Sequence, residues 1–120
     1  MFNLKNITLK KLGMKIDNSI NPQVEVKVIG VGGGGCNAVA KMVKTQEPGI
    51  KYLAVNTDTQ ALGIMNQIST FAIGPQVTGG LGSGGNAGIG KKAIRESQDQ
   101  LGELLSGVEM VFITAGMGGG

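Results

Sequence analysis

Three clusters of glycine, each directly after a predicted strand, constrain this sequence more than any other feature. Of its 22 glycines, 16 lie within residues 30–35, 79–90 and 116–120. A flexible linker would scatter or repeat its glycines, and it would lack the strand and helix patterns that separate these clusters. Three separate segments therefore require a main chain without side chains.

Hydrophobic periodicity predicts that strands and helices alternate after Pro22. Strands are expected at residues 24–31, 52–55, 69–73 and 110–114. Helices are expected at residues 37–44, 61–65 and 86–106. Thr57 and Gln60 fit a capping box that opens the second helix. Parallel neighbours need crossover connections, so this order predicts an α/β fold: a three-layer, Rossmann-like parallel sheet with helices on both faces.

Ligands of such sheets bind at the carboxyl ends of the strands, where the glycine clusters lie. Positive-φ turns can point successive N–H groups into one concavity, and a helix N-terminus adds its partial positive charge, so the clusters suit phosphate. Gly30, Gly32 and Gly35 fit the G-x-G-x-x-G pattern, which alone is weak evidence for a dinucleotide site. Because no G-x-x-x-x-G-K-[ST] motif is present, main-chain donors are expected to hold the phosphate.

Composition excludes several classes of function. The chain has no His and one Cys, which rules out a Ser-His-Asp triad, a His-ligated metal, an internal disulfide and a Cys-cluster zinc site. From Ile16 onward 7 basic residues face 8 acidic ones, and aromatic residues are few, so no nucleic-acid partner is expected. No apolar run approaches the roughly 20 residues of a membrane span. A single cysteine fits a reducing, cytoplasmic compartment.

The basic head differs from the rest of the chain. Residues 1–22 contain four lysines within the first sixteen residues and are interpreted as a flexible N-terminal extension. Two alternatives stay open: a short amphipathic helix that acts as a membrane-surface or targeting signal, and a physiological start at Met14.

Four segments closely resemble, in order, the nucleotide loops of the tubulin/FtsZ family, above all its bacterial cell-division GTPases. They are residues 28–37, 54–62, 80–86 and 110–120. The resemblance implies a cytoplasmic, GTP-binding domain acting at the division site, with GTP or GDP and Mg²⁺ as ligands. It also implies head-to-tail self-association into the division ring, GTP hydrolysis at subunit interfaces, and contacts with membrane-tethering and regulatory division proteins.

The resemblance assigns nucleotide-binding roles residue by residue. The first segment implies phosphate and nucleoside contacts, the second lies near the γ-phosphate and magnesium, the third senses the γ-phosphate, and the fourth opens the tubulin signature. The residues are Gly33, Gly34, Gly35, Cys36 and Asn37; Asn56 and Asp58; Gly82, Ser83, Gly84 and Gly85; and Gly118, Gly119 and Gly120. Cys36 stands where the family usually has glycine.

No catalytic residue is assigned, because the family's acidic catalytic loop and guanine-binding helix follow this region. The chain is therefore expected to be the N-terminal part of a GTP-binding domain, truncated within the signature loop. By itself it is expected to hold most of the phosphate loops and to be inactive.

Simpler interpretations remain for several residues. Asn56 and Asp58 also fit helix capping, and Gly79 and Gly80 fit an ordinary turn. The Cys36 thiol is either acidified by the nearby helix N-terminus or simply packed. The cations Lys91, Lys92 and Arg95 either approach phosphates or form a solvated helix face. Two other functions stay open: a dinucleotide-binding oxidoreductase and a non-catalytic filament module.

Overall fold

The chain's structure is a computed structural model that describes residues 25–45 and 47–119. The expected extension at residues 1–22 lies outside this range. The strands are β1 (Val26–Val31), β2 (Ile50–Asn56), β3 (Ser69–Ala72) and β4 (Met110–Ala115). The helices are α2 (Gly32–Met42), the short 3-10 helix η1 (Val43–Thr45), α3 (Thr59–Gly63), α4 (Pro75–Thr78), α5 (Ala87–Glu96) and α6 (Gln98–Leu104).

The four strands form one parallel sheet in the order β3-β2-β1-β4. In the central register, Val28 of β1 lies between Tyr52 of β2 and Phe112 of β4. A parallel register needs a crossover between neighbouring strands, and the helices supply it. The parallel α/β sheet expected from the sequence is confirmed.

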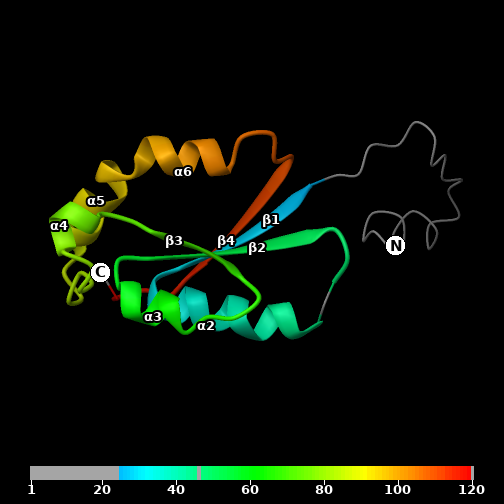
Figure 1. Cartoon of the computed structure of the whole chain (residues 1–120), viewed down its shortest axis with the longest axis horizontal. Coiled ribbons are helices and arrows are strands. Elements are labelled where there is room, and N and C mark those ends of the chain that lie inside the picture. Colours follow the sequence, from blue (N-terminus) through cyan, green and yellow to red (C-terminus); the bar gives the residue numbers. More distant parts are fainter. Residues whose placement is uncertain (1–24, 46, 120) are drawn as a thin grey trace, which may run out of the picture.

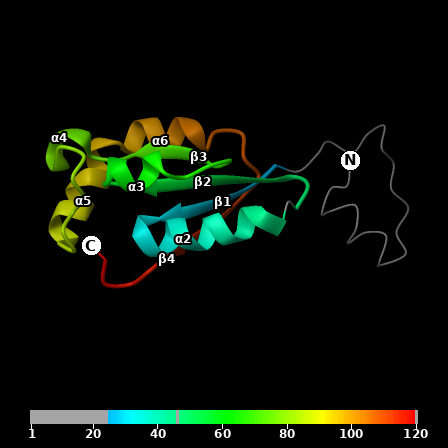
Figure 2. The same ribbon diagram turned by 60° about the horizontal axis from the view of Figure 1, so that its bottom comes forward.

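Helices cover both faces of the sheet, with α2 and α3 on one side and α5 and α6 on the other (Figure 1 and Figure 2). A hydrophobic core lies on each face of the sheet. Alternate residues of one strand belong to different cores, because successive side chains of a strand point to opposite faces. Leu53 and Val55 pack with Ala93 of α5, whereas Ala54 packs with Cys36 of α2. The expected three-layer arrangement is therefore confirmed.

The first predicted helix begins earlier than expected. It was placed at residues 37–44, but α2 already begins at Gly32. Because glycine in a helix carries an entropic cost, a run of glycines in a sequence predicts a loop rather than a helix. Consequently Gly33, Gly34 and Gly35 belong to the first turn of a helix.

The Thr57–Gln60 capping box predicted for α3 is wrong, whereas the alternative cap, Asp58, is confirmed. Asp58, not Thr57, is the N-cap, and its Oδ1 accepts hydrogen bonds from the main-chain N–H groups of Gln60 (3.0 Å) and Ala61 (3.1 Å). Both residue types are common caps. Only the position of the first helical turn distinguishes between them.

The helix predicted at residues 86–106 is two helices. Its start is correct, since Asn86 caps α5, but the main chain leaves helical angles at Ser97 (φ −104°, ψ 10°) and resumes as α6. The Ser97 side chain accepts a hydrogen bond from the N–H of Gly74, which precedes the unpredicted helix α4. A contact with a segment 23 residues away thus accompanies the break.

Strand β4 forms one edge of the described sheet. Its apolar side chains are unusually exposed, with Phe112 at 55% and Ile113 at 70%. Within the described ranges, none of the helices combines the length and apolar character needed to cross a bilayer.

Candidate functional site

Three glycine segments meet at the carboxyl edge of the sheet and enclose a hollow of about 640 Å³, called here the glycine cleft. In both views the start of α2, the segment between α4 and α5, and the end of β4 lie at the same end of the molecule (Figure 1 and Figure 2). The lining residues are Val31, Gly32, Gly33, Gly34, Gly85, Ala87, Ala115, Gly116, Met117, Gly118 and Gly119.

The start of α2 differs from the starts of α3 and α5. Side chains of Asp58 and Asn86 accept hydrogen bonds from the first turns of α3 and α5. The N-cap of α2 is Val31, which has no capping side chain, and the first turn of α2 carries no acid. The first N–H groups of a helix have no intrahelical partner. The first turn of α2 thus offers bare N–H groups and a positive dipole end to the cleft.

Not every glycine of the first cluster faces the cleft. A Cβ on Gly30 would overlap the main chain of Gly35, and a Cβ on Gly35 would overlap the carbonyl oxygen of Thr114. A Cβ on Gly33 would meet nothing within 4 Å. Gly30 and Gly35 therefore let α2 approach the strands closely, whereas Gly33 leaves open space above the helix.

The third segment, residues 80–86 within the second glycine cluster, reaches the cleft through turns that need positive φ. Gly82, Gly84 and Gly85 have φ values of 94°, 62° and 76°. Side chains on Gly84 and Gly85 would meet nothing within 4 Å. The Ser83 hydroxyl donates to the carbonyl oxygen of Gly119 at 3.4 Å, which joins the third segment to the fourth.

Asn56 and Asp58 do not line the glycine cleft. The buried Asn56 side chain accepts hydrogen bonds from the N–H groups of Thr57 (2.8 Å) and Asp58 (3.3 Å), and Asp58 caps α3. Their turn supports the third segment instead, because the N–H of Thr59 donates to the carbonyl oxygen of Gly80 at 3.1 Å. The capping role left open by the sequence is thus confirmed for Asp58, whereas the Asn56 side chain bonds the turn that precedes α3.

Cys36 is packed rather than exposed to the cleft. Its side chain is 5% exposed, and its Sγ lies 3.5 Å from the carbonyl oxygen of Val55. Burial raises the pKa of the Cys36 thiol. The alternative of an acidified thiol is therefore wrong. The cysteine fills the core between α2 and the sheet, so a ligand in the glycine cleft meets at most its main chain.

Asn37 lines a second hollow, of about 540 Å³, beside α2. This hollow also contacts Cys36, Asn56 and Gly33, so Gly33 borders both hollows. The sequence predicts that Gly33, Cys36, Asn37 and Asn56 belong to one site. The structure separates a cleft lined mainly by glycines from a neighbouring hollow lined by amide and apolar side chains and by Lys44.

Sequence reasoning missed part of the cleft. Of the predicted residues, Gly33, Gly34, Gly85, Gly118 and Gly119 line it, and Gly120 lies outside the described residues. The lining residues not predicted as site residues are Val31, Gly32, Ala87, Ala115, Gly116 and Met117. Their position directly after a strand or at the start of a helix was the available signal.

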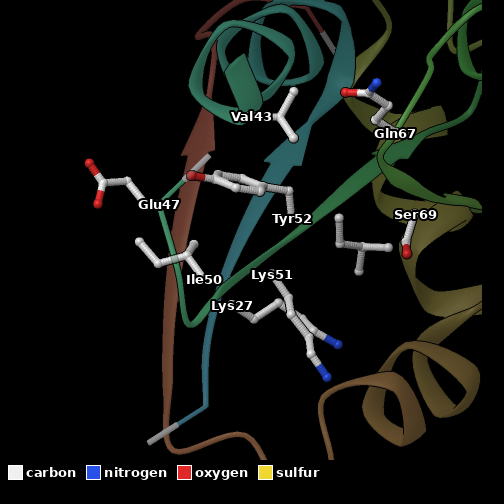
Figure 3. Close-up of a pocket in the computed structure, with 9 residues that line it drawn as sticks. Lys27, Val43, Glu47, Ile50, Lys51, Tyr52, Gln67 and Ser69 are labelled. Carbon is white, nitrogen blue, oxygen red and sulfur yellow. The ribbon is translucent and has the colours of Figure 1, made fainter. Parts of the chain in front are cut away.

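A third hollow, of about 420 Å³, lies at the amino end of β2. Lys27 and Lys51 are register partners there and lie side by side in Figure 3, where the hydroxyl end of Tyr52 points toward the side of Glu47. The Lys27 Nζ donates to the carbonyl oxygen of Leu104 at 3.1 Å, and Lys51 pairs with Glu25 at 3.0 Å. Because the chain itself already provides partners for both ammonium groups, this hollow is a weaker anion site than the glycine cleft.

Comparison with known proteins agrees with the geometry. The family model for the Tubulin/FtsZ family, GTPase domain, matches residues 25–120. A point mutant of FtsZ from M. jannaschii has a TM-score of 0.77 and 34% identity, and the match covers 97% of this chain and 33% of that one. An empty FtsZ dimer from M. jannaschii has a TM-score of 0.75 and 31% identity, over 98% of this chain and 33% of that one.

A GTPgS-bound protofilament of CetZ2 from Haloferax volcanii is also similar, with a TM-score of 0.67 and 27% identity over 80% of this chain and 31% of that one. The chain thus spans about a third of the length of these solved structures. The family model covers nearly all of the described residues, including every segment of the glycine cleft. The chain therefore belongs to the Tubulin/FtsZ family, GTPase domain.

Proposed function

We propose that this chain forms the phosphate-binding part of a guanine-nucleotide site, with the polyphosphate lying in the glycine cleft. One observation carries the proposal: α2 begins without a capping side chain at the point where three glycine segments meet. Phosphate oxygens would accept hydrogen bonds from the free N–H groups of the first turn. Open space above the lining residues Gly33 and Gly85 lets them approach the main chain.

The remaining predicted residues take supporting roles in this proposal. The second hollow beside Asn37 is where the nucleoside would lie, since it adjoins the cleft at Gly33. Asp58 sits behind Gly82, whose Cβ would stand 3.6 Å from the Cβ of Asp58. The described residues hold no group of three or more Cys, Asp or Glu side chains that could bind a metal. A magnesium ion would therefore take most of its ligands from phosphate oxygens and water.

The family and the similar structures support a proposal for the activity of the whole protein. Those structures include an FtsZ dimer and a GTPgS-bound CetZ2 protofilament. We propose that the full protein assembles head to tail, hydrolyses GTP at subunit interfaces and acts in the cytoplasm at the division site, with tethering and regulatory partners. Residues 1–22 would be a basic extension and residues 23–120 the first part of the GTP-binding domain.

Ligand competition tests the proposal. The 120-residue chain is titrated with a fluorescent GTP analogue in the presence of Mg²⁺, and GTP, inorganic triphosphate and NAD are added as competitors. GTP and triphosphate are expected to displace the analogue, because the main-chain donors bind phosphate. Displacement by NAD at the same concentration as GTP would favour a dinucleotide site. Failure of triphosphate to compete would place the ligand outside the glycine cleft.

A further inference from the structure

The short helix α4 is held by two consecutive residues at the junction of α5 and α6. The Glu96 carboxylate accepts hydrogen bonds from the N–H groups of Gln76 (3.1 Å) and Val77 (2.9 Å). The Ser97 hydroxyl accepts one from the N–H of Gly74 (2.9 Å). Figure 1 shows α4 at the same end of the molecule as the start of α5.

Glu96 is placed unfavourably for its own helix. It is the last residue of α5, where the negative end of the helix dipole repels an acid. The same carboxylate binds the first turn of α4, where N–H groups lack intrahelical partners and an acid is favourable. An acid at this position therefore stabilises the start of α4 rather than the end of α5.

Ser97 and Gly74 make the more buried half of this contact. Ser97 is 1% exposed, and it breaks the helix predicted at residues 86–106. Gly74 has a φ of 60°, and a Cβ on it would overlap Ala93 of α5. The turn that begins α4 thus fits closely against α5, and the Ser97 hydroxyl satisfies an N–H that this close fit removes from water.

The hydrogen bonds continue from α4 into residues 79–85, which follow it in the chain. Thr78, the last residue of α4, accepts a hydrogen bond from the N–H of Gly80 at its Oγ1 (3.1 Å), and its carbonyl oxygen accepts one from the N–H of Leu81 (3.2 Å). The carbonyl oxygen of Gly80 in turn accepts a bond from the N–H of Thr59 at 3.1 Å. The N–H and the hydroxyl of Thr78 both donate to the carbonyl oxygen of Gly74 at 3.0 Å. An unbroken set of hydrogen bonds therefore runs from Ser97 to the turn that approaches the cleft.

We propose that Glu96 and Ser97 are positioning residues for the nucleotide site: they fix α4 and, through Thr78, hold residues 79–85 in the conformation that borders the glycine cleft. The inference rests on the proposed function, because it is the proposed function that makes residues 79–85 part of a nucleotide site. Neither residue lines the cleft. Their effect on a ligand is transmitted through α4.

Hydrogen–deuterium exchange of the nucleotide-free 120-residue chain tests this inference. Ser97→Ala leaves the buried N–H of Gly74 without its acceptor and is expected to raise exchange in residues 74–85 by about tenfold or more. Glu96→Ala is expected to raise it severalfold, and Glu96→Gln, which keeps one acceptor oxygen, by an intermediate factor. Ser106→Ala and Glu103→Ala, at exposed positions in or near α6, are the matched controls and should change nothing.

Exchange in β1 and β2 separates positioning from simple loss of stability. Acceleration limited to residues 74–85, with GTP affinity weakened by about threefold or more, supports the proposal. Unchanged exchange in residues 79–85, or equal acceleration in β1 and β2, overturns it. A helix-propensity effect alone would make Glu96→Ala protective, because alanine is the better helix former. Absence of GTP binding by the unmodified chain would instead refute the proposed function, while the exchange result would still decide whether α4 is held as described.

Discussion

Gly34 lies against Gly116: a Cβ built on Gly34 would stand 3.5 Å from the Cα of Gly116. The first turn of α2 and the segment after β4 thus face each other through bare main chain. Because no side chain intervenes, the N–H groups on both sides remain accessible to one ligand. This relationship brings the first and third glycine clusters into a single cleft.

Two glycines of the first cluster should respond oppositely to alanine. Gly30→Ala is expected to destabilise the fold by about 1–3 kcal/mol or more, since the new methyl group overlaps the main chain of Gly35. Gly33→Ala is expected to leave stability unchanged or to raise it by up to about 1 kcal/mol, because alanine is favoured in a helix and its space is open. Urea unfolding measures both changes.

Affinity for the nucleotide should depend on Gly33, although the stability of the fold does not. The methyl group of Gly33→Ala would occupy the cleft, so we expect affinity for GTP to fall by about tenfold or more while the chain stays folded. Unchanged GTP affinity in a folded Gly33→Ala variant would contradict the placement of the polyphosphate above α2.

Replacement of Asp58 separates helix capping from a role in metal binding. Asp58→Ala should cost about 0.5–2 kcal/mol in thermal or urea unfolding, because the N–H groups of Gln60 and Ala61 lose their acceptor. Asp58→Asn should retain most of that stability, since asparagine is an equally good cap. If Asp58→Asn nevertheless lowers GTP affinity only when Mg²⁺ is present, the carboxylate acts on the metal as well as on α3.

The Cys36 thiol should be unreactive in the folded chain. Burial raises its pKa, so at neutral pH the thiol stays protonated and inaccessible. A disulfide reagent should therefore modify it only at the rate of unfolding, and mild denaturant should accelerate the reaction. Rapid labelling of the native chain at pH 7 would disprove this packing.

The same pKa shift predicts the direction of a pH effect. The folded chain holds the thiol proton more tightly than the unfolded chain, so between the two pKa values the folded state binds more protons. Stability contributed by Cys36 is therefore complete below the ordinary thiol pKa and decreases as the pH rises above it. Cys36→Ala should remove this part of the alkaline decrease in urea stability, which can be compared directly with the unmodified chain.

The exposed edge of β4 should promote self-association of the 120-residue chain. An edge strand with exposed apolar side chains, such as Ile113 at 70% exposure, is a template for pairing with another strand. Sedimentation velocity is expected to show concentration-dependent association. Ile113→Lys should reduce it, because a charged edge residue opposes strand addition, and the substitution changes a side chain that is already mostly in water. Equal association of both forms would exclude β4 as the contact.

The sequence alone predicted the sheet because its evidence is local. Alternating and helical periodicities appear within single segments, and the order of strands and helices implies parallel pairing. For the same reason Asn86 was correctly placed at the start of α5. The three glycine clusters also identified the edge of the sheet where the cleft is found. These conclusions needed no knowledge of what lies opposite each residue.

Only the tertiary structure decided which glycines pack and which face open space. Gly33 and Gly35 are both assigned to nucleotide binding from the sequence, yet Gly35 is pressed against Gly30 and the carbonyl oxygen of Thr114, whereas Gly33 borders the cleft. The structure likewise shows that Cys36 lies in the core and that the predicted long helix is interrupted at Ser97. Each of these outcomes depends on groups distant in the sequence, because a periodic pattern gives the direction of a side chain but not the atoms that occupy the space it enters.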